Sequence, residues 1–252
     1  PERYVQFADH RDRPFFDLAA RIGAAEPAWV ADLGCGTGAL TAVLAERWPG
    51  APVTGLDSSA DMIREAKARS GGNPGFVQGQ IQEWNPSSEP GVLLSNAALQ
   101  WVPGHEDLLG RWAKALDPGS WIAVQVPGNF NAPSHVLMRE LAESPRWSPA
   151  LAGVLRGGDS VAEPEQYLEL FVDAGMNTDV WETSYSQVLT GTNPVLDWVR
   201  GTALRPVMAA LPPEEYEGFE AEYAALLRQA YPPKPWGTVF PFRRIFMVAH
   251  KP

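Results

Sequence analysis

Short apolar runs alternate with amphipathic segments over residues 13–126. Apolar runs that predict β-strands lie at residues 29–33, 53–56, 75–78, 91–95 and 121–126. Apolar residues at the spacing of one helix face lie at residues 14–22, 40–48, 60–68 and 105–116. Strands and helices in this order are typical of βαβ units, whose right-handed crossovers place helices on both faces of a parallel sheet. The pattern therefore predicts an α/β fold.

The pattern changes after Val126, where residues 127–160 are rich in Pro, Trp and Gly. One helix and two strands are predicted beyond this segment, at residues 164–174, 180–188 and 240–249. Residues 192–235 carry helical patterns between these two strands. We interpret residues 1–252 as a single domain in which 127–160 and 192–235 are helical insertions that cap the sheet and form the substrate pocket.

Charge and composition exclude several classes of binding partner for this protein. The chain has 20 Lys and Arg against 30 Asp and Glu, a net charge of −10, which argues against nucleic acid or an anionic membrane surface as partner. Its one cysteine cannot form an internal disulfide, and no apolar run reaches the ~18 residues of a membrane span. We expect a cytoplasmic protein, either a monomer or a weak homo-oligomer.

A glycine-rich loop follows the first predicted strand, with the sequence Asp32-Leu33-Gly34-Cys35-Gly36-Thr37-Gly38. Glycines at such a turn permit positive φ and the close approach of a ligand. Asp32 would repel a pyrophosphate but can hold an ammonium group, and Asp57 at the end of the second strand can accept hydrogen bonds from ribose hydroxyls. The glycine spacing also departs from the dinucleotide pattern G-x-G-x-x-G. These features favour an adenosyl ligand with a cationic amino-acid tail.

The same segments resemble the class I S-adenosylmethionine-dependent methyltransferases. Five segments occur along the chain in the same order as the motifs of that family, at residues 30–38, 55–59, 78–83, 95–102 and 116–124. The resemblance implies a Rossmann-like, mostly parallel seven-stranded sheet whose last strand is antiparallel to its neighbours. It also implies S-adenosylmethionine as the methyl donor and S-adenosylhomocysteine as the product.

The resemblance also implies roles for single residues. The backbone at Gly34 and Gly36 would meet the methionine portion, and Ser58 and Met62 would flank the adenine. Apart from the resemblance, we expect Arg13 to bind the cofactor's carboxylate, although it could instead pair with a surface aspartate such as Asp17. Gln80 stands where many relatives have an aspartate, so it would be a weaker, neutral acceptor for the adenine amino group. The full predicted cofactor set is Tyr4, Arg13, Asp32, Gly34, Cys35, Gly36, Asp57, Ser58, Met62, Gln80, Ile81 and Asn96.

Segments around this core resemble the trans-aconitate methyltransferases, which convert one carboxylate of a small tricarboxylic acid into a monomethyl ester. The five matching segments are residues 4–14, 95–101, 133–135, 198–206 and 240–244. A sister enzyme that acts on another small carboxylic acid has the same features. Two further alternatives are a C- or N-methyltransferase of this fold and a non-catalytic S-adenosylmethionine-binding protein.

A carboxylate acceptor is already ionised at pH 7 and needs no general base. We therefore predict no catalytic residue and no metal, with Gln100 and Trp101 positioning the acid for in-line transfer. The remaining carboxylates need cationic partners, and residues 223–252 contain no Asp or Glu. Strict strand alternation lets only one of Arg243 and Arg244 reach the pocket. The predicted acid-binding set is Trp101, His135, Trp198, Arg200, Arg205, Arg243 and Arg244.

Overall fold

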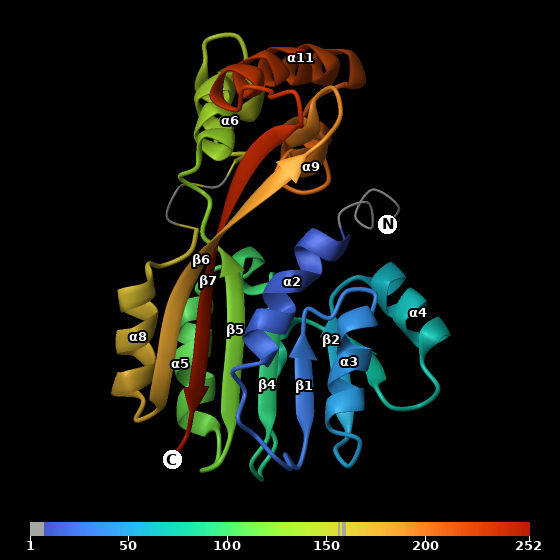
Figure 1. Ribbon diagram of the computed structural model, residues 1–252, viewed down its shortest axis with the longest axis vertical. Helices are drawn as coiled ribbons and strands as arrows, with labels where there is room; N and C mark the ends of the chain where they lie inside the picture. The colour runs from blue at the N-terminus through green and yellow to red at the C-terminus, as the bar shows by residue number, and fades with distance from the viewer. Residues whose placement is uncertain (1–7, 156, 158–159) are drawn as a thin grey trace. The chain divides into compact units, whose positions relative to one another are not determined.

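The computed structural model (Figure 1) describes residues 8–155, 157 and 160–252. The chain divides into two compact units. The first, here called the sheet unit, comprises Arg11–Pro127, Val161–Thr183 and Arg244–Pro252. The second, here called the helical unit, comprises Gly128–Ser160 and Ser184–Arg243 together with the described residues 8–10.

Seven strands form one sheet in the order β3-β2-β1-β4-β5-β7-β6. Their bounds are β1 Val30–Leu33, β2 Val53–Asp57, β3 Gly75–Gln78, β4 Val92–Asn96, β5 Trp121–Pro127, β6 Asn177–Leu189 and β7 Thr238–His250. Strands β1 to β5 pair in parallel, whereas β7 pairs antiparallel with β5, and its red arrow in Figure 1 points opposite to the green arrow of β5. The predicted α/β fold with an antiparallel last strand is confirmed.

Helices cover the sheet on two faces, as the crossover rule predicts. The helices of this part of the chain are α2 Ala8–Ala19, α3 Ala39–Arg47, α4 Ala60–Arg69, α5 His105–Ala115 and α8 Pro164–Asp173, with 3-10 turns η1 Ile81–Glu83 and η2 Leu99–Trp101. One sheet face buries residues such as Leu93 and Val124 against Leu109 and Trp112 of α5 and Phe171 of α8. The sheet, α5 and α8 thus enclose the main core, and the opposite face is covered by α2, α3 and α4, of which α4 packs Ile63 and Ala66 on Phe76 of β3.

The predicted helix after Pro164 is confirmed as α8, with Tyr167 and Phe171 fully buried on one stripe. It ends before Gly175, which adopts φ 76°, a conformation that glycine reaches at no steric cost. At the start of α4, the Ser59 hydroxyl accepts a hydrogen bond from the Met62 N–H at 3.4 Å. These local signals fix where the helices of the sheet unit begin and end.

The helical unit has a hydrophobic core of its own. Its helices are α6 Pro133–Glu143, α7 Ser148–Leu151, α9 Pro194–Arg200, α10 Arg205–Ala210 and α11 Pro213–Ala230. Phe219 and Tyr223 of α11 are fully buried there, together with Phe240 of β7. The unit therefore extends beyond the insertions predicted at 127–160 and 192–235, because the ends of β6 and β7 supply apolar residues to its core.

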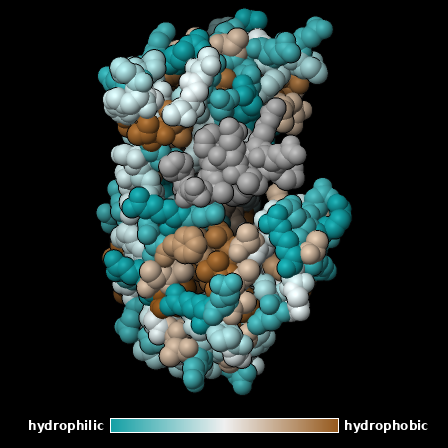
Figure 2. All heavy atoms as spheres, turned by 45° about the vertical axis from the view of Figure 1, so that its right-hand side comes forward, coloured by the Kyte–Doolittle hydropathy of each residue, from teal (hydrophilic) through white to brown (hydrophobic). Residues whose placement is uncertain are grey.

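In the space-filling view of one face (Figure 2), hydrophilic residues dominate and hydrophobic ones gather in a few small patches. None of the helices within the described ranges combines the length and the apolar character that crossing a bilayer requires.

Candidate functional site

The glycine loop leaves β1 in a left-handed conformation, with φ 86° at Gly34, 55° at Gly36 and 76° at Gly38. The N–H groups of Gly34 and Cys35 both donate to the Leu56 carbonyl of β2, at 2.7 and 3.1 Å. An ideal Cβ at Gly34 would lie 2.2 Å from the Cβ of Ala98, whereas one at Gly36 would meet nothing within 4 Å. Gly34 is therefore required by packing within the protein, and Gly36 faces open space that a ligand can enter.

Asp57, the last residue of β2, is held by two backbone donors. Its Oδ2 accepts from the Gly36 N–H at 2.9 Å and its Oδ1 accepts from the Ser59 N–H at 2.9 Å. A carboxylate has about four acceptor sites, so each oxygen keeps capacity for one more donor. Asp57 thus ties the glycine loop to the start of α4 and still offers two acceptors to a pair of hydroxyls.

Asp32 of β1 is a buried carboxyl group with only 4% of its surface exposed. Its Oδ2 accepts from the Thr41 hydroxyl of α3 at 2.6 Å. Burial raises the pKa of Asp32 to about 6, and the nearby charge of Asp57 adds to this, although the Thr41 hydrogen bond acts in the opposite direction. A cationic group next to Asp32 would offset that cost, so this position suits an ammonium group.

The remaining predicted cofactor residues differ in how far they are buried. Burial raises the pKa of the Cys35 thiol, so it stays protonated and unreactive at pH 7. Met62 is half-buried on α4, while Ser58 and Gln80 are exposed. The Cδ1 of Ile81 comes within 3.7 Å of the position that a Gly34 Cβ would take, so Ile81 borders the loop.

Two predicted residues come from the amino-terminal part of the chain. Tyr4 lies outside the described residues. Arg13 is exposed on α2, and its Nε lies 3.8 Å from the Asp17 carboxylate one turn further along. The geometry of α2 alone therefore gives Arg13 an intrahelical partner and does not assign it to a ligand.

The carboxyl end of β4 turns sharply after Asn96. Ala97 adopts φ 54°, which is uncommon for a residue with a side chain, and its carbonyl accepts from the Gln100 Nε2 at 2.7 Å. The Asn96 Oδ1 is buried and accepts no hydrogen bond from any residue that the structure describes. Trp101 follows in η2 with 48% of its surface exposed. This turn therefore presents a buried acceptor and an exposed aromatic ring close together in the chain.

Arg244 is a cation of the sheet unit on β7, the strand that pairs with β5. It is buried, with 6% exposed, and its Nη1 donates to the Gln125 Oε1 of β5 at 3.3 Å. Arg243, the preceding residue of β7, belongs to the helical unit, where its Nη1 donates to the Gly128 carbonyl at 3.4 Å. The two neighbours therefore have different surroundings.

Three predicted acid-binding residues lie on α9 and α10 of the helical unit. Trp198 packs in the core against the rings of Phe240 and Phe242, whose centroids lie 5.8 and 5.7 Å away. The fork of Arg200 donates to both Glu220 oxygens at 2.8 and 2.9 Å, and this interaction raises the pKa of Arg200. Arg205 is exposed, and its guanidinium has no hydrogen bond or ion pair to another residue in the described ranges.

His135 lies in the first turn of α6. Its Nδ1 is 3.2 Å from the Ser134 hydroxyl, and its ring packs against Phe130 with the centroids 5.6 Å apart. Burial lowers the pKa of His135 to about 4, and the charge of Arg139 lowers it further. His135 is therefore neutral at pH 7, where it can donate one hydrogen bond but carries no charge.

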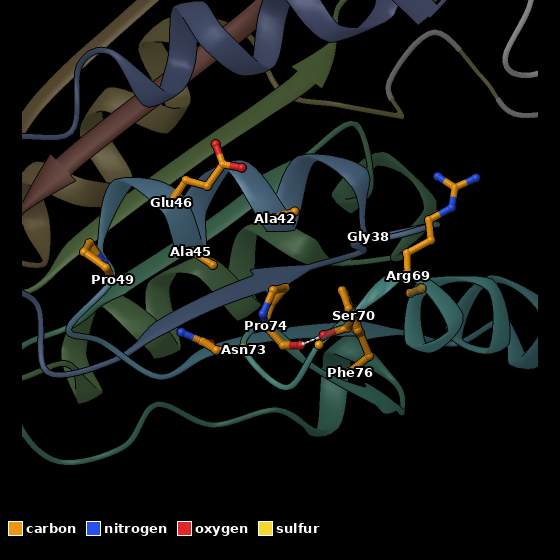
Figure 3. Close-up of a pocket in the computed structure, with 12 residues that line it drawn as sticks. Gly38, Ala42, Ala45, Glu46, Pro49, Arg69, Ser70, Asn73, Pro74 and Phe76 are labelled. Carbon is orange, nitrogen blue, oxygen red and sulfur yellow. Dashed lines mark hydrogen bonds between the residues drawn. The ribbon is translucent and has the colours of Figure 1, made fainter.

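A surface cavity of about 380 Å³ lies between α3 and the segment that joins α4 to β3 (Figure 3). Ala42 and Ala45 of α3 line it on one side, and Asn73, Pro74 and Phe76 line it on the other. None of the predicted cofactor or acid-binding residues lines this cavity. Where the chain is described, no three His, Cys, Asp or Glu side chains lie close enough together to hold a metal ion.

The methyltransferase domain family matches residues 30–119, which span β1 to the turn before β5. A trans-aconitate 2-methyltransferase from Streptomyces avermitilis is 51% identical over 100% of this chain and 96% of the relative. Another from Rhodococcus jostii is 52% identical over 99% of this chain and 98% of the relative. The chain belongs to the trans-aconitate 2-methyltransferase family.

Solved structures support the fold of this family member at much lower sequence identity. The YcgJ protein of Bacillus subtilis matches 96% of this chain and 98% of its own, with a TM-score of 0.61 and 13% identity. A phosphoethanolamine N-methyltransferase of Haemonchus contortus, solved with S-adenosylhomocysteine, matches 95% of this chain and 52% of its own, with a TM-score of 0.53 and 16% identity. These matches show a methyltransferase-like fold.

Two residues that were not predicted from the sequence form hydrogen bonds with predicted site residues. Thr41 donates to the buried Asp32, and Gln125 accepts from the buried Arg244. Each had a signal in the sequence. Thr41 is a polar residue among the apolar residues of a predicted helix, and Gln125 interrupts the apolar run Trp121–Val126. A polar residue inside a buried element usually has a partner, so both were candidates.

Proposed function

We propose that this protein transfers the methyl group of S-adenosylmethionine to one carboxylate of a small tricarboxylic acid, trans-aconitate, to give a monomethyl ester. The observation that carries the proposal is the 51–52% identity to curated trans-aconitate 2-methyltransferases over essentially the whole chain. The product of the cofactor is S-adenosylhomocysteine, and the reaction needs no metal.

The residues of the glycine loop fit this cofactor. The two remaining acceptor positions of Asp57 suit a pair of ribose hydroxyls, and the buried Asp32 suits the ammonium group. The open space at Gly36 admits the ligand against the backbone, and the Asn96 Oδ1 offers a buried acceptor that lacks a donor among the described residues. When bound, S-adenosylmethionine supplies an electrophilic methyl group on a positively charged sulfur.

The protein's part in the chemistry is to bind and align the acid. The acceptor carboxylate is ionised at pH 7, so no side chain has to remove a proton from it. Alignment brings the reacting atoms to ~3–3.5 Å of each other, and exclusion of water strengthens the electrostatics. We assign the alignment to Gln100 and Trp101, which follow the turn at Ala97.

The other carboxylates of the acid need cations, and we assign them to arginines. Arg244 is buried beside a neutral amide, and Arg205 has an exposed guanidinium. Arg200 already binds Glu220 through its fork and Asp197 through Nη1 at 2.5 Å, which makes it a poorer candidate. The roles of Arg243, His135 and Trp198 in binding the acid stay predictions from the sequence.

Mass spectrometry of the acid tests the function directly. Trans-aconitate, cis-aconitate and citrate are incubated in parallel with the protein and S-adenosylmethionine. We expect a gain of one methyl group, chiefly on trans-aconitate. Methylation of another acid alone would place this protein among enzymes for other small carboxylic acids. Binding of S-adenosylhomocysteine without methylation of any acid would support the non-catalytic alternative.

Replacing Arg205 with alanine should raise the KM for the acid about 10-fold and leave the affinity for S-adenosylhomocysteine unchanged, because the change removes one charged donor. Steady-state kinetics and calorimetry measure the two quantities. Arg228→Ala, in the same unit, is the matched control, since the Arg228 side chain bonds to Asn193. Equal effects of both variants on the acid KM would argue against a specific role for Arg205.

Cofactor affinity should depend on pH through Asp32. Burial raises the pKa of Asp32 above its usual range to about 6, so ionising Asp32 costs folding free energy once the pH rises through this range. A bound ammonium favours the ionised form, so affinity rises with pH up to about 7 and falls about 10-fold by pH 5. Calorimetry of S-adenosylhomocysteine between pH 5 and 8 measures this, and Asp32→Asn should bind more weakly with a flat profile. An equally steep profile in that variant would assign the titration to another group.

A further inference from the structure

Gln125 is a completely buried amide side chain within a strand that is otherwise apolar. Its side chain is 0% exposed, and its neighbours in β5, Val124 and Val126, are also fully buried. It lies near the carboxyl end of the strand, the edge at which open α/β sheets bind their ligands. Burying an amide costs free energy unless its donors and acceptors are paired, so the position calls for partners.

The pairing of the strands places Gln125 on the same face of the sheet as two predicted site residues. Asn96 of β4 is its direct partner in the parallel ladder, so both side chains point to one face. Phe246 of β7 is its partner in the antiparallel ladder, and Arg244 lies two residues from Phe246 on that same face. Asn96 and Gln125 therefore lie side by side, and Arg244, whose direct partner on β5 is Pro127, lies diagonally from Gln125 on the same face, all within the sheet unit.

The contact with Arg244 determines which of the two Gln125 amide atoms, Oε1 or Nε2, faces the guanidinium. A guanidinium carries only donors, so the Gln125 atom that accepts from Arg244 Nη1 at 3.3 Å has to be the oxygen. The Nε2 of Gln125 then points away from that guanidinium nitrogen. It is buried and donates to no atom of the described part of the chain. An amide N–H in this state lacks an acceptor that a ligand can supply.

We propose that Gln125 is a specificity-determining residue for the acid: its Oε1 fixes the Arg244 guanidinium, and its Nε2 donates to a carboxylate oxygen of the acid that Arg244 binds. The inference rests on the proposed function. An arginine and a neutral amide side by side present donors to the two oxygens of one carboxylate. Glutamine serves here where glutamate would not, because a carboxylate at position 125 would compete with the acid for Arg244.

A subsite that offers only hydrogen-bond donors discriminates between acids that carry a carboxylate at this position and analogues that lack one. An analogue in which an amide or a methyl ester replaces this carboxylate loses the charge and leaves buried donors unpaired. We therefore expect the protein to accept acids that carry this second carboxylate and to reject analogues without it, even when the reacting carboxylate is unchanged.

Two substitutions test the role of Gln125 in the full-length protein. Gln125→Met keeps the length of the side chain and removes both polar atoms, and it should raise the KM for trans-aconitate about 10-fold. Gln125→Glu keeps the shape and an acceptor for Arg244, and it should raise that KM about 100-fold because it adds a repelling charge. In both variants kcat should change less than about 3-fold, and the affinity for S-adenosylhomocysteine less than about 2-fold.

The order of the two variants separates a binding role from a structural one. If Gln125 only supported Arg244, glutamate would be the milder change, since it gives the guanidinium a stronger partner. Gln125→Glu being milder than Gln125→Met would therefore overturn the proposal, as would an unchanged KM in both. Because Gln125→Glu preserves volume and the Arg244 contact, it is the variant for which folding is best protected, and S-adenosylhomocysteine binding verifies it.

Gln166→Met is the matched control for the loss of a glutamine amide. The Gln166 Oε1 accepts from the Glu163 N–H at 2.9 Å in the capping box of α8, so its loss should lower the melting temperature slightly and leave the acid KM unchanged. An unmodified protein that methylates no acid would overturn the proposed function and this inference together. If the unmodified protein is active and neither Gln125 substitution changes the KM for the acid, only the inference about Gln125 would be overturned.

Discussion

Replacing Asp57 with alanine should weaken the binding of S-adenosylhomocysteine by at least about 100-fold, the largest loss that we expect from a single polar residue of the cofactor loop. The carboxylate would lose its hydrogen bonds to two ribose hydroxyls, and bonds to a charged group contribute roughly 1.5–3 kcal/mol each. The N–H groups of Gly36 and Ser59 would lose their acceptor at the same time. Isothermal titration calorimetry with S-adenosylhomocysteine measures the loss.

Two further variants sharpen the Asp57 experiment. Asp57→Asn keeps one oxygen and the volume of the side chain, so its loss should be intermediate. Asp61→Ala removes an exposed carboxylate of α4 whose partner is Arg64 at 2.7 Å, and it should leave cofactor affinity unchanged because exposed ion pairs contribute little. A loss below about 3-fold in Asp57→Ala, or an equal loss in Asp61→Ala, would contradict the assignment of Asp57 to the ribose.

The sheet and the glycine loop could be predicted because their signals are local. Each strand of the parallel half is an apolar run, and the structure places β1 and β2 within one residue of the predicted bounds. The left-handed glycines were expected from the strand-to-helix turn. The position of Asp57 at the end of β2 follows from counting along the strand, but its two backbone donors come from separate loops and only the structure reveals them.

The arginines show where sequence reasoning stops. The sequence predicted that Arg200 binds the carboxylates of the acid, yet its fork binds Glu220, which lies 20 residues further along the chain on α11. Such a pair depends on how α9 packs against α11, and no local pattern encodes that packing. The same limit applies to Arg244, since only the register of β5 against β7 brings it to Gln125.

The extent of the helical unit was also beyond the sequence pattern. Strands β6 and β7 are 13 residues long each, and their ends belong to the helical unit instead of the sheet unit. Phe240 and Phe242 alternate with exposed residues, a pattern that predicts a strand and nothing more. What those rings pack against is a long-range property, and here they pack against Trp198 of α9.

Replacing Gly34 with alanine should have the largest effect of any single methyl group added to this loop. The new Cβ would lie 2.2 Å from the Cβ of Ala98, and since both atoms are fixed to backbone, no rotamer change can relieve the overlap. The left-handed φ of 86° adds strain. Together these costs should reach roughly 3 kcal/mol, which lowers the melting temperature by about 6–12 °C even without ligand.

Gly36→Ala separates the effect of an added methyl group on the stability of the free protein from its effect on cofactor binding. An added Cβ at Gly36 meets nothing within 4 Å, so the free protein should lose only the roughly 1–2 kcal/mol of a left-handed residue. The same methyl group would occupy space that the cofactor needs, and the affinity for S-adenosylhomocysteine should fall much more than stability. Gly34→Ala combined with Ala98→Gly removes the overlap and should recover most of the stability that Gly34→Ala loses. If the double variant stays as unstable as Gly34→Ala, the strained φ and not the contact with Ala98 is what requires glycine at position 34.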